Sequence, residues 1–271
     1  MASSPKVIIP MADYGHDPTE TAVPYQIFTK AGFTVFFATE SGKSPRCDEM
    51  MLSGVTGALL GAEKPAKKAY TNMIGTGSID ETKGSLGRPF SWTNPDFALS
   101  DYDLVFLPGG HEKGVRQLID AEPIHKQLQM YFPLTQKASS GNKKVLAAIC
   151  HGVQVLAYTP DSEARDKSII HACKTTALPS FMESTIYAMT SPFLGDYYKT
   201  YGKGTPDVEE YVKKGLDDPE KQFVQGPRWW GMGTPMTVED DVYRYVSGRF
   251  PPDAAKVAER AVEMVREARA D

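Results

Sequence analysis

Four short apolar runs recur in the first 150 residues, each with the length of a strand buried on both faces. They cover residues 6–10, 33–39, 103–108 and 145–150. Between the first two, residues 19–31 carry apolar side chains at helical spacing, and Gly32 follows as a stop. A strand, a helix and a second strand in this order predict a βαβ unit and therefore a parallel sheet.

The later chain is less regular. We predict helical structure over residues 114–135, a strand at 168–173, helices beginning near 180 and 207, a strand over 242–249 and a last helix from Pro251. Two stretches with weak periodicity are interpreted as insertions, around 45–100 and 185–236, that cap the fold. The prediction is one α/β domain over residues 1–271, a doubly wound, mostly parallel sheet with helices on both faces.

The strongest chemical signal is Cys150, where an apolar run ends and helical spacing begins. A strand that turns sharply into a helix at a nucleophilic residue is typical of a nucleophile elbow at the carboxyl edge of a sheet. The positive end of the new helix would favour the thiolate. A lone cysteine is more often a small buried hydrophobe, but the adjacent His151 and Gly152 favour catalysis.

Two other strand ends carry candidate site residues. Glu20 lies in the first turn of the first predicted helix, where a carboxylate ordinarily complements the helix dipole. The functional alternative is that Glu20 faces the elbow and exchanges a proton with the thiol. Gly109 and Gly110 follow the strand at 103–108, and glycines there let backbone N–H groups reach developing negative charge. We name Gly110 as one oxyanion donor and the amide of His151 as the second, with His111 as a pocket wall.

The residues Ala147-Ala148-Ile149-Cys150-His151-Gly152 resemble the elbow of the ThiJ/PfpI superfamily. Its Pro-Gly-Gly-His segment is matched at 108–111, and residues 15–20 resemble the segment that carries its glutamate. The resemblance implies a flavodoxin-like fold and the larger heat-shock and glyoxalase III-like branch. It also implies that Glu183, after an Ala-Leu-Pro lead-in, completes a Cys-His-Glu set by fixing the tautomer of His151.

Composition narrows the choice of partners. The 271 residues carry a net charge of −4, which gives no reason to expect nucleic acid or an anionic membrane as partner. We expect no signal segment and no membrane-spanning run. Three cysteines without CxxC spacing suggest no disulfide framework and fit a reducing, cytoplasmic setting. The five histidines lack ligand spacing, so we predict no metal and no cofactor.

The resemblance implies a glutathione-independent glyoxalase that converts a small reactive carbonyl substrate, methylglyoxal or another 2-oxoaldehyde, to a 2-hydroxy acid. A Cys-dependent hydrolase, peptidase or deglycase would use the same residues. A chaperone-like or redox stress-response protein would oxidise Cys150 without catalysis. A glutamine amidotransferase is disfavoured, because its late His-x-Glu has no counterpart after His171. Superfamily members are commonly dimers, so the resemblance also implies a homodimer.

Overall fold

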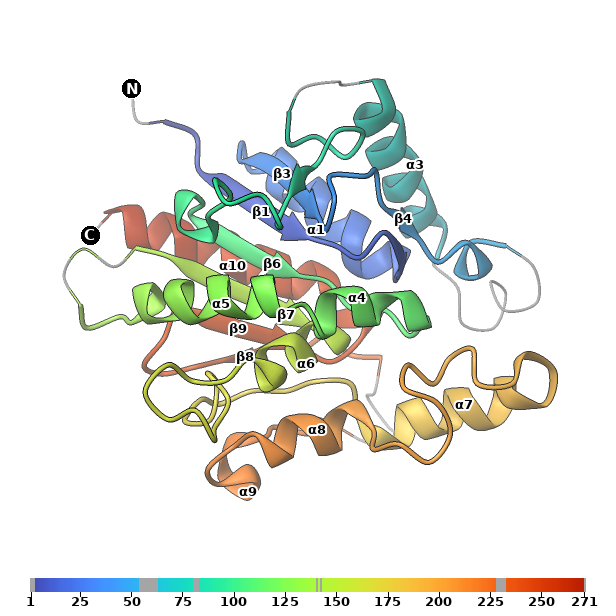
Figure 1. Cartoon of the computed structure of the whole chain (residues 1–271). Coiled ribbons are helices and arrows are strands. Elements are labelled where there is room, and N and C mark those ends of the chain that lie inside the picture. Colours follow the sequence, from blue (N-terminus) through green and yellow to red (C-terminus); the bar gives the residue numbers. More distant parts are fainter. Residues whose placement is uncertain are drawn as a thin grey trace.

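A seven-stranded sheet forms the centre of the molecule (Figure 1). The computed structural model describes residues 3–53, 63–79, 83–139, 141, 143–227 and 233–270, and within them the strand order is β5-β3-β1-β6-β7-β9-β8. Neighbours run parallel except β8, which is antiparallel to β9. The strands are β1 (Lys6–Pro10), β3 (Thr34–Thr39), β5 (Phe90–Ser91), β6 (Leu104–Leu107), β7 (Val145–Ile149), β8 (Val238–Glu239) and β9 (Tyr245–Gly248).

The three central strands β1, β6 and β7 are apolar because both of their faces are covered. Every residue of β6 and β7 is buried, and β1 is buried after its first residue. Such continuous apolar runs are what a parallel sheet between two helical layers requires. The predicted doubly wound α/β fold is confirmed, and so are the four strands expected in the first 150 residues.

Helices cover both faces of the sheet. On one face α1 (Pro18–Lys30) packs against α10 (Ala254–Ala270), and α3 (Lys64–Ile79) packs on α1. The opposite face carries α4 (Arg116–Ile119), α5 (Glu122–Tyr131) and α6 (His151–Tyr158) (Figure 1). Short 3-10 turns complete the connections at Glu49–Met51, Leu99–Asp101, Lys113–Val115, Phe132–Thr135 and Pro251–Asp253.

Residues 180–222 form an outer layer beside α6. They contain α7 (Ser180–Leu194), α8 (Val208–Lys214) and α9 (Pro219–Gln222). In Figure 1 these helices are yellow to orange and run along one side of the sheet, and α8 contacts both α6 and α7. This layer occupies most of the insertion predicted around 185–236, of which residues 228–232 lie outside the described residues. Of the insertion predicted around 45–100, residues 54–62 and 80–82 lie outside the described residues.

The strand predicted over residues 168–173 is wrong. The segment instead makes successive turns, in which the amide of His171 donates to the carbonyl of Ser168 at 3.0 Å and that of Cys173 to Ile170 at 2.9 Å. Ile169, Ile170 and Cys173 are buried in these turns, and burial alone does not distinguish a turn from a strand. The sequence reading also missed a small parallel pair of strands, β2 (Tyr14–His16) and β4 (Arg46–Cys47).

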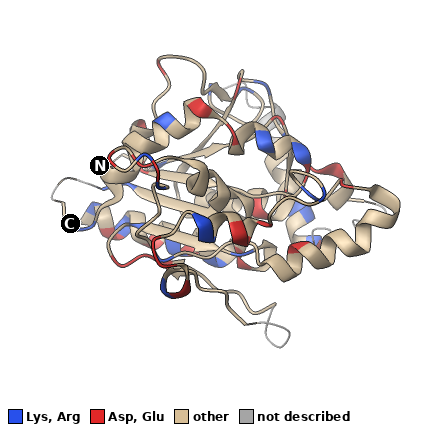
Figure 2. Cartoon of the chain, turned by 60° about the horizontal axis from the view of Figure 1, so that its bottom comes forward, with Lys and Arg blue, Asp and Glu red and all other residues tan. Residues whose placement is uncertain are grey.

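Charged residues of both signs are interspersed on the surface. Figure 2 shows lysines and arginines beside aspartates and glutamates on the helices of that view, in keeping with the net charge of −4. Of the helices in the described ranges, none is both long enough and apolar enough to cross a membrane.

Candidate active site

Cys150 stands at the turn between β7 and α6. Its backbone has φ 57° and ψ −126°, and it is the one non-glycine residue with positive φ in the described part of the chain. Such a conformation costs about 1–3 kcal/mol and persists only where the surroundings enforce it. Here the Cys150 amide donates to the carbonyl of Gly248 at 3.1 Å, and the Val153 amide donates to the carbonyl of Cys150 at 3.1 Å. The sharp turn expected from the sequence is therefore present.

Two glycines allow the elbow to close. A side chain on Gly152 would place its first carbon 2.7 Å from the carbonyl carbon of Leu107. Glycine at position 152 therefore lets α6 approach β6 more closely than any other residue type at that position would permit. A side chain on Gly109 would meet Cys150 at 2.6 Å and would also strike the carboxylate of Glu20. Gly109, Cys150 and Glu20 thus form one tightly packed group at the carboxyl ends of β1, β6 and β7.

His151 connects the thiol to a threonine hydroxyl. Its Nδ1 lies 3.4 Å from Cys150 Sγ, and its Nε2 lies 2.9 Å from Thr200 Oγ1. The same hydroxyl is 2.9 Å from the carbonyl oxygen of His111, which can only accept. Thr200 therefore donates to His111 and accepts from Nε2–H, which leaves Nδ1 of a neutral ring free to accept the thiol proton.

Burial keeps the His151 ring neutral. It lowers the pKa of His151 well below its ordinary value, and the nearby His111 and Lys199 lower it further. The ring is 2% exposed. The lowered pKa therefore indicates an uncharged imidazole, and the hydrogen bonds of Thr200 place its proton on Nε2.

The thiol of Cys150 is protonated at rest, contrary to the expectation of a thiolate. Burial raises the pKa of Cys150 well above its ordinary value and the charge of Glu20 raises it further, whereas the backbone N–H of His151 lowers it. Desolvation in a site with 1% exposure outweighs the field of the helix. The proton must leave when the sulfur attacks, and Nδ1 of His151 is placed to take it.

Glu20 is a fully buried acid beside the sulfur. Burial raises the pKa of its carboxyl well above the ordinary value, and the neighbouring Asp17 adds to this shift, while Cys150 and the backbone of Gly109 oppose it. Neither carboxyl oxygen has a partner at hydrogen-bond geometry among the described residues. The raised pKa favours the protonated carboxyl, which can give a proton to a bound molecule.

Two residues that the sequence reading did not select hold this group in place. The amide of Asp17 and Nδ1–H of His16 both donate to the carbonyl of Gly109 at 3.0 Å, and Nε2 of His16 accepts from Ala12 at 2.8 Å. Asp17 also caps α1 by accepting from the amide of Glu20 at 3.1 Å. Burial raises the pKa of Asp17 to about 6. An Asp directly before the proline that opens a helix is a capping signal that could have identified Asp17.

The structure does not bring Glu183 to His151, which corrects the predicted Cys-His-Glu set. One Glu183 oxygen accepts from Nζ of Lys199 at 2.9 Å and the other from the amide of Val208 at 2.8 Å. Lys199 also pairs with Asp207. A buried ammonium needs such counter-charges, so Glu183 serves Lys199, while Thr200 occupies the place beside Nε2. No periodicity or motif in residues 195–207 points to Thr200.

His111 forms part of the wall next to the elbow, as predicted. Its ring lies edge-on to that of His151 with centroids 5.0 Å apart, and Tyr198 packs against its other side at 6.1 Å. Burial lowers the pKa of His111 to about 4, helped by the charge of Lys199. Its Nε2 and the Tyr198 hydroxyl are buried polar atoms without a hydrogen-bond partner among the described residues. Gly110 packs against the 15–17 loop, and the oxyanion roles of Gly110 and the His151 amide stay predictions.

A cavity of about 620 Å³, the elbow cavity, lies next to this group. Asp17, which caps the helix of Glu20, and His111, whose ring packs against His151, both line it, whereas Cys150, Glu20 and His151 are not among its lining residues. The other walls come from helices α1, α3, α7 and α10 and from the segments between elements, and consist of Thr19, Val23, Met51, Glu63, Pro65, Ala66, Leu178, Met182, Ile186, Tyr198, Gly233, Pro235, Phe250, Pro251, Pro252 and Ala255. Among the described residues, no group of three or more His, Cys, Asp or Glu side chains is arranged to hold a metal ion.

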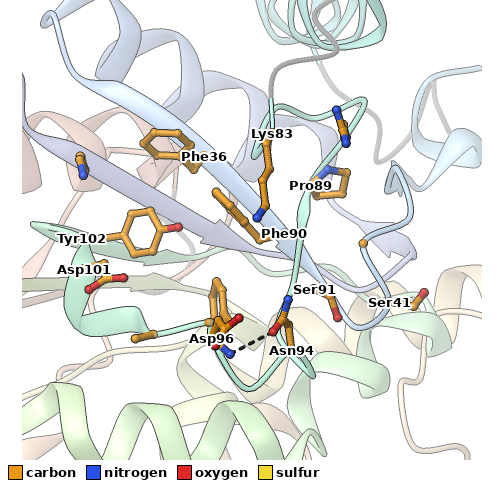
Figure 3. A pocket seen from close by; sticks show the side chains of 15 residues that line it. Phe36, Ser41, Lys83, Pro89, Phe90, Ser91, Asn94, Asp96, Asp101 and Tyr102 are labelled. Carbon is orange, nitrogen blue, oxygen red and sulfur yellow. Dashed lines mark hydrogen bonds between the residues drawn. The ribbon is translucent and has the colours of Figure 1, made fainter.

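A second pocket of about 480 Å³ lies at the β5 edge of the sheet and shares no lining residue with the first. Figure 3 shows its aromatic floor, formed by rings such as Phe36, Phe90 and Tyr102, with Lys83 above Phe90 at 5.6 Å. None of the predicted site residues lines it, whereas His111 lines the elbow cavity.

Comparison with known proteins agrees with this geometry. The family model described as ThiJ/PfpI family-like matches residues 11–227. An uncharacterised protein of Schizosaccharomyces pombe is 29% identical over 251 residues, which is 92% of this chain and 79% of that protein. The glutathione-independent glyoxalase hsp3101 of the same yeast is 24% identical over 194 residues, or 66% of this chain and 70% of that protein.

Among solved structures, glyoxalase III from Candida albicans superposes with a TM-score of 0.62 at 20% identity, covering 96% of this chain and 97% of that one. At this identity the likeness concerns the fold.

Proposed function

The chain belongs to the ThiJ/PfpI-like family, and on that premise we propose that it is a glutathione-independent glyoxalase with Cys150 as nucleophile. The observation that carries the proposal is the line of contacts from Cys150 Sγ through the neutral His151 ring to Thr200. It provides a nucleophile together with a base whose tautomer is fixed. The similarity to the yeast glutathione-independent glyoxalase and to Candida glyoxalase III supports the same reaction class.

In the first step, Cys150 Sγ bonds to the aldehyde carbon of a 2-oxoaldehyde. The thiol proton passes to Nδ1 of His151, and the aldehyde oxygen takes a proton from the Glu20 carboxyl. The product is a hemithioacetal beside an imidazolium and a carboxylate. This step uses the thiol, the unprotonated Nδ1 and the protonated acid in their resting states.

In the second step, the proton moves between the two carbons. The Glu20 carboxylate removes the hydrogen from the former aldehyde carbon as a proton, and the ketone oxygen takes a proton from His151, which gives an enediol. Glu20 then returns a proton to the second carbon while His151 takes the hydroxyl proton from the first. The result is a thioester of the 2-hydroxy acid, and the carbon skeleton is neither oxidised nor reduced overall.

Water completes the cycle. It adds to the thioester carbonyl and gives one proton to the Glu20 carboxylate. The sulfur leaves and takes its proton back from His151. The free 2-hydroxy acid departs, and all three groups regain their starting protonation states.

The test is lactate formation from methylglyoxal in the absence of glutathione. We expect wild type to form lactate and Cys150→Ala to lose at least about 10³-fold in kcat/KM, because the covalent step has no other nucleophile. Cys173→Ala, also buried but without a contact to His151, is the matched control and should keep its activity. Absence of lactate with wild type, or full activity in Cys150→Ala, would refute the proposal and favour a hydrolase or a chaperone-like protein.

A further inference from the structure

The elbow cavity is much larger than methylglyoxal requires. Its volume of about 620 Å³ lies within the range of about 300–1,000 Å³ that is usual for sites binding drug-sized molecules. Methylglyoxal carries a single methyl group beside its two carbonyls. If methylglyoxal bound with a carbonyl group at the elbow, water would fill most of the cavity.

Two polar residues that line the cavity are in contact with the elbow group. Asp17 caps the helix of Glu20, and the His111 ring packs against His151 and Tyr198. Nε2 of His111 has no hydrogen-bond partner among the described residues and is available to an oxygen of a dicarbonyl. A buried polar atom without a partner is unfavourable, so binding of such a group is favoured here.

Apart from Thr19, Glu63, Tyr198 and Gly233, the other lining residues are apolar. They combine aliphatic, proline and aromatic side chains, and consist of Val23, Met51, Pro65, Ala66, Leu178, Met182, Ile186, Pro235, Phe250, Pro251, Pro252 and Ala255. Burial of apolar ligand surface against them stabilises a complex. The walls therefore favour a ligand whose far end is hydrocarbon.

Negative charge on the ligand is disfavoured. Asp17 and Glu63 line the cavity, so a carboxylate or phosphate on a substrate would enter a site that already contains two acids and would lose its hydration against the apolar walls.

We infer that the preferred substrates are uncharged 2-oxoaldehydes whose side group is a hydrocarbon much larger than methyl. The inference rests on the proposed glyoxalase function and adds to it the class of substrate. The dicarbonyl lies beside His111, and the hydrocarbon lies along α7 against Met182 and Ile186.

A homologous series of substrates tests this directly. Methylglyoxal, n-propylglyoxal and n-hexylglyoxal share one reactive group. The ratio of their kcat/KM values therefore measures how the cavity walls interact with the hydrocarbon side group. We expect kcat/KM for n-hexylglyoxal to exceed that for methylglyoxal at least about tenfold, and a terminally carboxylated analogue of similar length to fall at least about tenfold below n-hexylglyoxal. A ratio near one, or a decline with chain length, would overturn the inference and leave the proposed function standing. Lack of turnover of every member would overturn both.

A pair of methionine variants on α7 locates the effect. Met182→Trp fills part of the cavity and should lower the ratio of n-hexylglyoxal to methylglyoxal at least about tenfold. Met189→Trp makes the same change on the same helix at a side chain that is 48% exposed and outside the cavity lining, and should leave the ratio unchanged. An equal effect of both variants, or none for Met182→Trp, would contradict a hydrocarbon site against α7.

Discussion

Two regions meet at His151 and are held by different forces. The elbow, residues 145–152, is fixed by backbone packing, because Gly152 lets α6 lie against the carbonyl of Leu107. The segment of residues 195–207 is fixed by buried charge, because Lys199, with a side chain 8% exposed, pairs with Glu183 and Asp207. The elbow supplies the nucleophile and the base. The 195–207 segment supplies the hydroxyl that sets the tautomer of the base.

The two regions differ in how well each can be recognised from the sequence. Backbone packing requires particular residue types at adjacent positions, so the elbow is visible in the local sequence. A buried ion cluster joins residues far apart in the chain, since Lys199 and Glu183 are separated by 16 positions. Its carboxylates look like catalytic acids or surface charges until the cation is located.

The largest effect is expected on the elbow side, at Glu20. Glu20→Gln cannot exchange the proton between the two carbons and should lose about 10³-fold in kcat/KM. Because the pKa of Glu20 is raised well above its ordinary value and the first step uses its protonated form, wild-type kcat/KM should fall as the pH rises through that pKa. A profile of kcat/KM against pH measures this. A decline on the acid side near the ordinary histidine pKa of about 6.5 would instead mean that His151 gains a proton in the free enzyme.

A smaller effect is expected where the two regions touch, at Thr200. Thr200→Val keeps the shape but removes the hydroxyl, so Nε2 of His151 loses its acceptor and the ring is free to carry its proton on Nδ1. We expect kcat to fall about 10²-fold, and Thr200→Ser to restore most of it. Steady-state kinetics of the two variants separate the hydroxyl from the methyl group.

Glu183 is the matched comparison for Thr200 and has the smallest expected effect on catalysis. Glu183→Gln leaves Lys199 paired with Asp207. It should lower kcat less than about tenfold while reducing the free energy of unfolding by about 1–3 kcal/mol, measured by denaturant titration. If Glu183→Gln were as inactive as Cys150→Ala while Thr200→Val were active, the assignment of the two residues would be reversed.

Much of the fold follows from the sequence alone. The apolar runs that become β1, β6 and β7 are continuous because helices cover both faces, and continuity is readable without knowledge of neighbours. The strand predicted over residues 168–173 fails because the same apolar content is buried in turns. Apolarity reports burial, and the hydrogen bonds that decide between a strand and a turn involve distant residues.

The candidate site divides in the same way. Cys150, His151, Glu20 and Gly109 lie at strand ends, and the carboxyl ends of parallel strands share one edge, so local patterns bring them together. Thr200 follows no strand and carries no motif, and only the fold places its hydroxyl 2.9 Å from His151. The protonation state of the thiol was also beyond the sequence, because burial of Cys150 opposes the helix field and its extent depends on the whole site.

Measuring the protonation state of the His151 ring is the most direct test of the proposed proton transfer from Cys150. Nitrogen-15 NMR of the histidine-labelled protein, with the His151 signal assigned by its loss in His151→Asn, reports the protonation of both ring nitrogens. We predict a neutral ring with the proton on Nε2 from roughly pH 5 to pH 8, and a loss of this preference in Thr200→Val. An imidazolium in this range, or a proton on Nδ1 in the wild type, would contradict the proposed transfer of the Cys150 proton to Nδ1.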